Sequence, residues 1–231
     1  MSTLYIIGTP IGNLGDISFR AVEILKTVDL LACEDTRRTL KLMSHLGLRI
    51  PLLSCRAQNE GFAAEKVIAS LKEGKTVAYA SDAGTPGVSD PGAILAHAAA
   101  EAGHAVIPIP GPSAFASLVS VAGGMDKTVV FEGFLSPKAG RRRSRLKELL
   151  AMETAFVLYE SPFRVLKLLE DLADFDSERY ICVGREMTKV HEEYLRGSVR
   201  EILFVLREKN KQIGEFSIYV SGKKINNCVN Y

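Results

Sequence analysis

The stretch Ala80-Ser81-Asp82-Ala83-Gly84-Thr85-Pro86-Gly87-Val88-Ser89-Asp90-Pro91-Gly92 decides the fold of this 231-residue chain. The apolar run Thr76-Val77-Ala78-Tyr79 before it predicts a buried strand, and residues 93–100 after it predict a helix. A plain connector needs only about two to six residues. We therefore expect a ligand-binding loop at the carboxyl end of a strand in an α/β sheet, with Asp90 capping the next helix. A purely structural turn is the alternative.

Three more loops rich in glycine or proline follow predicted strands. They cover residues 8–16, 108–114 and 160–162. Glycine lets backbone groups come close to a small polar ligand because it has no side chain to keep them apart. The four loops together predict a binding site at strand ends.

The secondary-structure pattern changes along the chain. Strand and helix patterns alternate through residues 1–111, which predicts an N-terminal α/β domain with a mostly parallel sheet. Shorter segments over residues 112–231 predict a C-terminal α+β domain with a mixed sheet, and a helix there is expected to begin near Arg145. The formal net charge is only +2, so a nucleic-acid partner would have to be held by a local basic patch.

Several classes of protein are not indicated. The cysteines, Cys33, Cys55, Cys182 and Cys228, lack the paired spacing of zinc ligands, so no metal is expected. There is no signal-peptide pattern and no apolar run of membrane-spanning length, which predicts a cytoplasmic protein without a membrane partner. The dinucleotide fingerprint GxGxxG and the HExxH metal motif are also absent.

Seven motifs follow one another in a fixed order. They are Gly8-Thr9-Pro10-Ile11-Gly12-Asn13-Leu14-Gly15-Asp16, Glu34-Asp35-Thr36-Arg37, residues 81–92, Pro110-Gly111-Pro112-Ser113-Ala114, Phe131-Glu132-Gly133-Phe134, Glu160-Ser161-Pro162 and Gly184-Arg185-Glu186. Together they resemble the tetrapyrrole methylase family, and within it the bacterial enzymes that methylate small-subunit ribosomal RNA. The resemblance extends from Leu4 to about Lys223. It departs at Cys55-Arg56-Ala57-Gln58-Asn59-Glu60, where family members often carry histidines.

The resemblance implies a two-domain fold, a homodimer, and S-adenosylmethionine bound in the cleft between the domains. It implies 2′-O-methylation of a cytidine ribose in 16S ribosomal RNA, free or in the assembled small subunit. The cofactor residues that it implies are Pro10, Asp82, Thr85, Pro86, Ser113, Ala114, Ser161, Pro162 and Gly214. A methyltransferase of a tetrapyrrole or another small molecule is the alternative on the same fold, and a non-catalytic RNA-binding module is a second one.

A ribose hydroxyl is a poor nucleophile until its proton is removed, so a general base is expected. Four carboxylates at predicted strand ends are candidates for it: Glu34, Asp35, Glu160 and Glu186. The alternative for each is an ion pair with a nearby arginine, such as Arg37 with Asp35 or Arg185 with Glu186.

One basic run could hold RNA phosphates. It contains Lys138, Arg141, Arg142, Arg143, Arg145 and Lys147 without an acidic residue, between a loop and the expected helix. A solvated surface is the usual alternative, but the resemblance to RNA methylases favours phosphate contact. Further candidates for RNA binding are Arg37, Arg38, Arg185 and Lys189.

Overall fold

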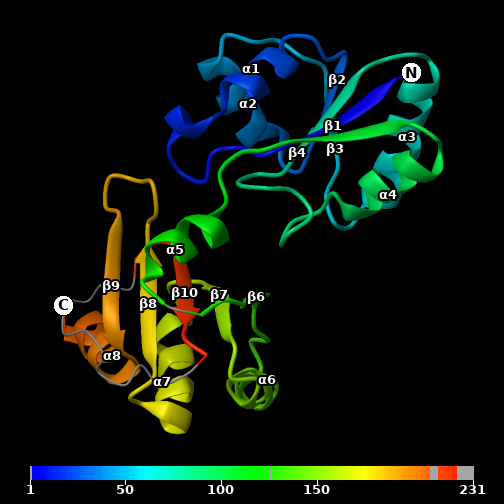
Figure 1. Ribbon diagram of the computed structural model, residues 1–231. Helices are drawn as coiled ribbons and strands as arrows, with labels where there is room; N and C mark the ends of the chain where they lie inside the picture. Colours follow the sequence, from blue (N-terminus) through cyan, green and yellow to red (C-terminus); the bar gives the residue numbers. More distant parts are fainter. Residues whose placement is uncertain (1, 125, 209–212, 223–231) are drawn as a thin grey trace. The chain divides into compact units, whose positions relative to one another are not determined.

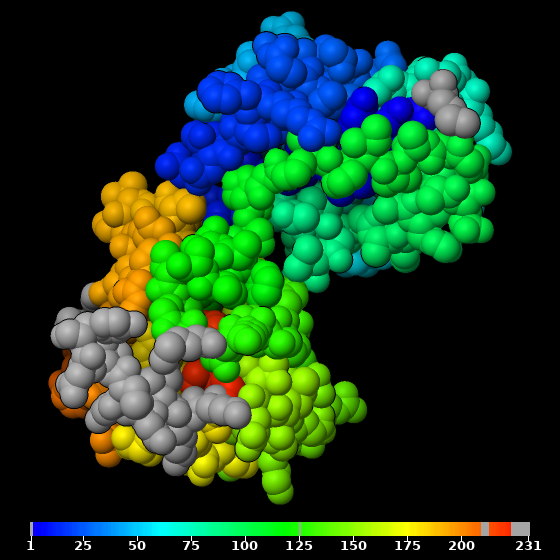
Figure 2. Space-filling view, in the orientation of Figure 1, coloured from blue at the N-terminus to red at the C-terminus, as the bar shows by residue number. Residues whose placement is uncertain are grey.

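A computed structural model describes residues 2–124, 126–208 and 213–222. The chain divides into two compact units, residues 1–113 and 114–231 (Figure 1). Figure 2 shows the packed surface of each unit, the first coloured blue to green and the second green to red.

The first unit is built on a five-stranded parallel sheet with the strand order β3-β2-β4-β1-β5. Its strands are β1 (Thr3–Ile7), β2 (Leu30–Cys33), β3 (Leu52–Ser54), β4 (Val77–Ala80) and β5 (Ala105–Ile109). Its helices are α1 (Phe19–Leu25), α2 (Thr36–His45), α3 (Glu60–Lys72) and α4 (Ala93–Glu101), and η1 (Leu14–Asp16) is a single 3-10 turn.

Helices cover both faces of this sheet, as Figure 1 shows. Successive strand residues point to opposite faces. Ile7 and Ala78 therefore pack with the side chains of α1 and α2, whereas Leu4, Val77 and Tyr79 pack with those of α3 and α4. Burial on both faces explains why β4 is apolar throughout. The loops that follow the strands all lie at the carboxyl edge of the sheet.

The start of α4 differs from the expectation. Asp90 does not cap this helix. Instead the buried carboxylate of Glu60, from the first turn of α3, accepts hydrogen bonds from the backbone N–H groups of Gly92, Ile94 and Leu95 at 2.9, 3.0 and 3.2 Å. Gly92 has φ +130°, and a Cβ there would lie 2.7 Å from the Tyr79 ring. The long loop is therefore held by a neighbouring helix, and Asp90 remains beside Ser81.

The second unit is built on a mixed sheet with the strand order β6-β7-β10-β8-β9. Only β6 and β7 are parallel, and the other pairs are antiparallel. Its strands are β6 (Val129–Phe134), β7 (Ala155–Glu160), β8 (Tyr180–Arg185), β9 (Glu193–Ser198) and β10 (Phe216–Val220). Its helices are α5 (Ala114–Ala122), α6 (Ala139–Ala151), α7 (Val165–Asp176) and α8 (Val199–Glu208).

The predicted fold class, a parallel N-terminal sheet and a mixed C-terminal sheet in an α/β protein, is confirmed. Two details of the second unit are different. α8 was not expected, and α6 begins at Ala139 rather than near Arg145. In the part of the chain that the structure describes, no helix has both the length and the apolar character needed to cross a membrane.

Candidate functional site

Three of the predicted loops meet at the carboxyl edge of the first sheet. The N–H groups of Thr9 and Gly84 each donate to the other residue's carbonyl oxygen, at 2.9 and 3.0 Å. The N–H of Gly8 donates to the carbonyl of Ile109 at 3.0 Å. A Cβ on Gly8 would lie 2.8 Å from the Cα of Gly111, so the two loops can cross only as glycines. The loops after β1, β4 and β5 are thus tied together by their backbones.

The predicted cofactor residues fall into two groups, one in each unit. Pro10, Asp82, Thr85, Pro86 and Ser113 belong to the joined loops of the first unit, where the Thr85 hydroxyl also donates to the carbonyl of Pro112 at 3.3 Å. The others, Ala114, Ser161, Pro162 and Gly214, belong to the second unit.

In the second unit, strand pairing brings part of that group together. Phe216 pairs with Glu160 across β10 and β7. Ser161 and Pro162 come just after β7, and Gly214 comes just before β10. They therefore lie at the same edge of the second sheet. Gly214 has φ +103°, and a Cβ there would overlap the side chain of Glu186.

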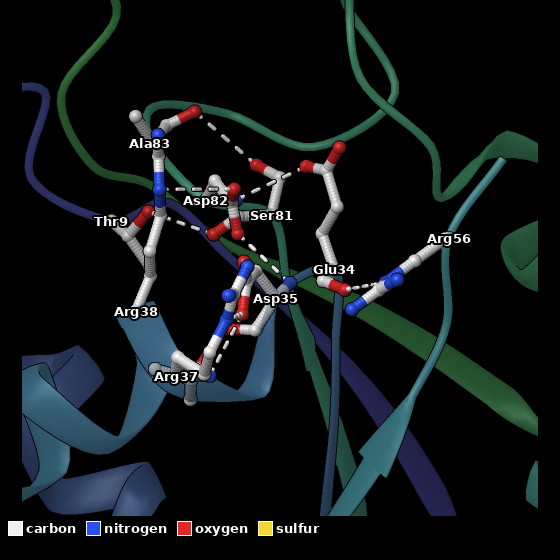
Figure 3. A network of polar contacts seen from close by, with 10 residues as sticks. Thr9, Glu34, Asp35, Arg37, Arg38, Arg56, Ser81, Asp82 and Ala83 are labelled. Atoms are coloured by element: carbon white, nitrogen blue, oxygen red, sulfur yellow. Dashed lines mark hydrogen bonds and ion pairs between the residues drawn. The ribbon is translucent and has the colours of Figure 1, made fainter.

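Two carboxylates are linked across neighbouring strands of the first sheet (Figure 3). Cys33 of β2 pairs with Ala80 of β4, which places the following residues side by side. The N–H of Asp82 donates to Glu34 Oε2 at 3.3 Å, and the N–H of Asp35 donates to Asp82 Oδ1 at 2.9 Å. These two hydrogen bonds tie the strand ends that carry Glu34 and Asp82 to each other.

Glu34 and Asp35 differ in their electrostatic surroundings, and their pKa values shift in opposite directions. Burial raises the pKa of Glu34, and the charges of Asp82 and Asp90 raise it further. The neighbouring Asp35 is held well below its ordinary pKa by hydrogen bonds from Arg37, whose Nη2 lies 2.6 Å from Asp35 Oδ2. Within the described residues Glu34 forms no ion pair, so its carboxylate is the better base of the two.

The other two candidate bases are engaged by cations. Glu160 is buried and lies 2.6 Å from Arg164 Nη2. Glu186 lies 2.9 Å from Lys189 Nζ. Burial alone would raise the pKa of Glu186, but Lys189 and the N–H of Glu215 bring it below its ordinary value. The ion-pair alternative is therefore found for these two, as it is for Asp35 with Arg37, although the partner of Glu186 is Lys189 and not Arg185.

A cavity of about 250 Å³ opens beside Asp82, on the side of the first sheet that α1 and α2 cover. Its apolar wall includes Leu14, Leu25, Leu31, Leu42 and Met43. Its polar lining includes Thr9, Arg38, Lys41, Ser81 and Asp82. Lys41, Leu42 and Met43 were missed in the sequence. The spacing i, i+3, i+4 of Arg38, Lys41 and Leu42 places them on one helix face and was the available signal.

The basic run lies on α6 itself, and this changes its interpretation. Arg142 is spaced like Leu146 and Leu149, so it points to the buried face of the helix and is 4% exposed. Its Nη2 lies 2.6 Å from Asp171 Oδ2. The prediction that Arg142 binds RNA is therefore wrong, because its guanidinium is used inside the fold.

The run itself contains no acidic residue, but acidic residues from elsewhere in the unit pair with two of its other arginines. Arg143 pairs with Asp171 and Asp174, and Arg145 pairs with Glu132 and Glu148. Lys138, Arg141 and Lys147 are exposed, and they form no ion pair among the described residues.

The remaining RNA candidates are paired as well. Arg37 contacts Asp35, and Arg38 lies 3.5 Å from Asp82. Arg185 pairs with Glu193, and Lys189 pairs with Glu186 and Glu215.

The described residues contain no group of three His, Cys, Asp or Glu side chains arranged as metal ligands. Cys33, Cys55 and Cys182 are buried free thiols, and Cys228 lies outside the described residues. That the protein uses no metal stays a prediction.

The comparison with protein families decides the classification. A family model described as tetrapyrrole (corrin/porphyrin) methylases matches residues 3–203. This chain belongs to that family. The match covers the first sheet, the strands β6 to β9 of the second sheet and all seven predicted motifs, and the predicted resemblance is confirmed at this level.

Individual relatives resemble the chain over nearly its whole length. A protein of Borrelia garinii subsp. bavariensis named ribosomal RNA small subunit methyltransferase I is 47% identical over 219 residues, 94% of this chain and 98% of that protein. A protein of Thermotoga maritima with the same name is 43% identical over 97% of this chain and 100% of its own length.

Two solved structures share the fold. The uroporphyrin-III-C-methyltransferase from Thermus thermophilus superposes with a TM-score of 0.64 at 16% identity, covering 96% of this chain and 95% of that one. A cobalt precorrin-4 methyltransferase superposes with a TM-score of 0.66 at 17% identity, covering 95% and 94%. At such identities the likeness concerns the fold alone.

Proposed function

We propose that this protein is an S-adenosylmethionine-dependent methyltransferase of small-subunit ribosomal RNA that methylates the 2′-hydroxyl of a cytidine. Support for the RNA substrate comes from the names of relatives that are 43–47% identical over almost the whole chain. Support for the attack on a hydroxyl comes from Glu34, a carboxylate that lies at a strand end and forms no ion pair in the described part of the chain. A homodimer is part of the same proposal.

The joined loops of the first unit fit a nucleoside cofactor. Gly8 and Gly111 leave no room for a Cβ between the loops, and Gly84 has φ +75°. Thr85 is exposed at these loops, and Pro10 and Pro86 beside it are buried. Ser113 precedes the first residue of α5, where the positive end of a helix suits the cofactor carboxylate. Contacts from Ser161, Pro162 and Gly214 stay predictions.

When bound, the cofactor supplies an electrophilic methyl group on its sulfonium sulfur. Glu34 would take the proton of the attacking ribose hydroxyl, whose oxygen would receive the methyl group as the sulfonium became a thioether. Proton transfer to a positioned base contributes about 10²- to 10⁴-fold in rate. Holding the two reactants in line contributes up to about 7–11 kcal/mol. The protein therefore needs only a fixed geometry and one unpaired carboxylate.

The test is methyl transfer from labelled S-adenosylmethionine to small-subunit RNA, offered both free and as assembled subunits that lack the modification. We expect label in 2′-O-methylcytidine after digestion to nucleosides. Calorimetry with the demethylated cofactor should show one site per chain. Label in a methylated base, or transfer to a tetrapyrrole and not to RNA, would overturn the proposal.

A further inference from the structure

We propose that the cavity beside Asp82 is a pocket for a cytosine base, and that Arg38 and Asp82 read its Watson–Crick edge. The inference rests on the proposed function, because it names the part of the RNA substrate that this site receives. It concerns residues of the first unit alone.

The size of the cavity matches one base better than a whole cofactor. Its volume is about 250 Å³. Pockets that enclose drug-sized ligands measure about 300–1,000 Å³, and S-adenosylmethionine, a nucleoside joined to an amino acid, is such a ligand. A single pyrimidine is much smaller. Enzymes that act on one nucleotide commonly take its base out of the stack into a pocket with apolar walls.

The walls have the character that a flat base requires. Leu14, which is 41% exposed, and the half-buried Leu42 supply apolar surface, whereas Met43 is buried. A base seated against Leu14 and Leu42 would cover apolar surface that is now open to water, which is favourable in proportion to the area buried. Lys41 adds a positive charge to the same lining, which suits a nucleotide phosphate.

The polar lining is complementary to cytosine. The Asp82 carboxylate is held in place because its Oδ1 accepts the N–H of Asp35 at 2.9 Å. Its Oδ2 lies 3.5 Å from Nε of Arg38, so an acceptor stands directly beside a guanidinium (Figure 3). Arg38 is 65% exposed, and its terminal nitrogens have no bonded acceptor among the described residues.

This order of groups selects between the two pyrimidines of RNA. Cytosine presents its N4 amino donor next to the acceptors N3 and O2. The donor matches Asp82, and the two acceptors match Arg38. Uracil presents the acceptor O4 in place of the amino group, which would set two acceptors against each other and leave a polar group unpaired.

The pocket is linked to the candidate base through Asp82. The N–H of Asp82 donates to Glu34 Oε2 at 3.3 Å, so the residue assigned to the nucleobase also contacts the candidate base. Glu34 is not among the residues that line the cavity.

The test measures binding of cytidine 5′-monophosphate and uridine 5′-monophosphate to the full chain by NMR titration. We expect the cytidine nucleotide to bind at least about tenfold more tightly, a difference of about 1.4 kcal/mol. Asp82→Asn keeps an oxygen for the Asp35 N–H but replaces the second acceptor with a donor, and should remove this preference. Arg38→Gln, at an exposed position that does not endanger folding, should weaken cytidine nucleotide binding by about tenfold.

Matched controls come from the same unit. Asp29→Asn changes another aspartate that accepts a backbone N–H, that of Thr76 at 2.8 Å, and that does not line the cavity. Arg49→Gln changes another exposed arginine that does not line the cavity. Both should leave the nucleotide preference as in the wild type.

Equal binding of the two nucleotides by the wild type would overturn the inference, and so would an unchanged preference in Arg38→Gln. Loss of S-adenosylmethionine binding in Asp82→Asn without loss of nucleotide preference would overturn it as well, by returning Asp82 to the cofactor. If the wild type prefers cytidine nucleotide but transfers no methyl group to RNA, the proposed function fails and the pocket stands. If the wild type methylates RNA but binds the two nucleotides equally, only the inference about the pocket is rejected.

Discussion

A single carboxylate, Glu34, differs from the other three candidate bases in what surrounds it. Asp35, Glu160 and Glu186 each contact an arginine or lysine within 3 Å, whereas Glu34 faces the N–H of Asp82. Burial and two neighbouring negative charges raise its pKa above the ordinary carboxyl value. A carboxylate with a raised pKa is a stronger base than an ordinary one when it is ionised.

The first prediction concerns Glu34→Gln, which keeps the shape of the side chain and removes its basicity. The single-turnover rate of methyl transfer should fall about 10²- to 10⁴-fold with cofactor affinity unchanged. In the wild type the rate should fall as pH drops through the raised pKa of Glu34, because the protonated carboxyl cannot accept a proton. The variant should lack this dependence.

The matched control for this prediction is Asp35→Asn, because asparagine caps a helix about as well as aspartate. Its transfer rate should stay within a few-fold of the wild type. An equal loss of rate in both variants, or a normal rate in Glu34→Gln, would assign the proton to another group.

From the sequence these four carboxylates could not be ranked. Each follows a predicted strand, and each has a basic residue within a few positions. What separates them is contact across strands, such as that of Glu34 with Asp82, which are 48 residues apart in the chain. The residue types of the site were therefore predictable, but their electrostatic states depend on the fold.

At the scale of one element, α6 places the like charges of one run on different faces of the helix. The run looked uniform in the sequence because most of it was expected to precede the helix. Once the helix starts at Ala139, Arg142 falls on the face of Leu146 and Leu149. The same reasoning applies to α8, whose buried Val199, Ile202, Leu203 and Leu206 follow the helical spacing i, i+3, i+4, i+7 and could have predicted it.

The second prediction follows from this sorting. Replacing Lys138, Arg141 and Lys147 together by alanine should flatten the dependence of log RNA affinity on log salt by about 2–3 units, since each lost phosphate contact contributes about 0.7–0.9. Stability should change little, because these side chains are exposed. The measurement is RNA binding over a series of salt concentrations.

Arg142→Ala is the contrasting variant. It removes the buried partner of Asp171 and leaves only the more exposed Arg143 paired with it, so the cost in the free energy of unfolding should lie below the roughly 3–5 kcal/mol of a buried charge left without any partner. Its salt dependence of RNA binding should match that of the wild type wherever it is folded. A triple variant with an unaltered salt slope would show that the exposed cations of α6 are only a solvated surface.

At the scale of the whole molecule, the sequence pattern was enough to predict the two sheets. Alternating strands and helices over residues 1–111 predicted the parallel sheet, and the shorter segments over residues 112–231 predicted the mixed one. The arrangement of side chains at the sheet edges was not predictable in that way. In the second unit β6 and β7 are parallel, and β7 and β8 are both antiparallel to β10, so the carboxyl ends of β6, β7 and β8 share one edge.

Large apolar side chains are exposed in the segments at this edge. They are Phe134 at 58%, Phe163 at 96%, Val190 at 96% and Ile213 at 75%. Single exposed apolar residues are ordinary, but several at one edge of a sheet are typical of a surface that is covered in the assembled protein. This edge is therefore the candidate interface of the proposed homodimer.

The third prediction is that light scattering at micromolar concentrations gives the mass of a dimer of the 25.2 kDa chain. A stable interface buries about 1,200–2,000 Å² and depends on a few large apolar side chains near its centre. Phe163→Ser combined with Val190→Ser should shift the mass toward the monomer by removing two of them. Phe19→Ser is the matched control, because Phe19 is 93% exposed on α1 of the other unit, and it should leave the dimer intact. A wild-type protein that stays monomeric over this range rejects the homodimer. A dimer that the double variant does not weaken places the interface elsewhere, and the exposed edge then needs a different occupant.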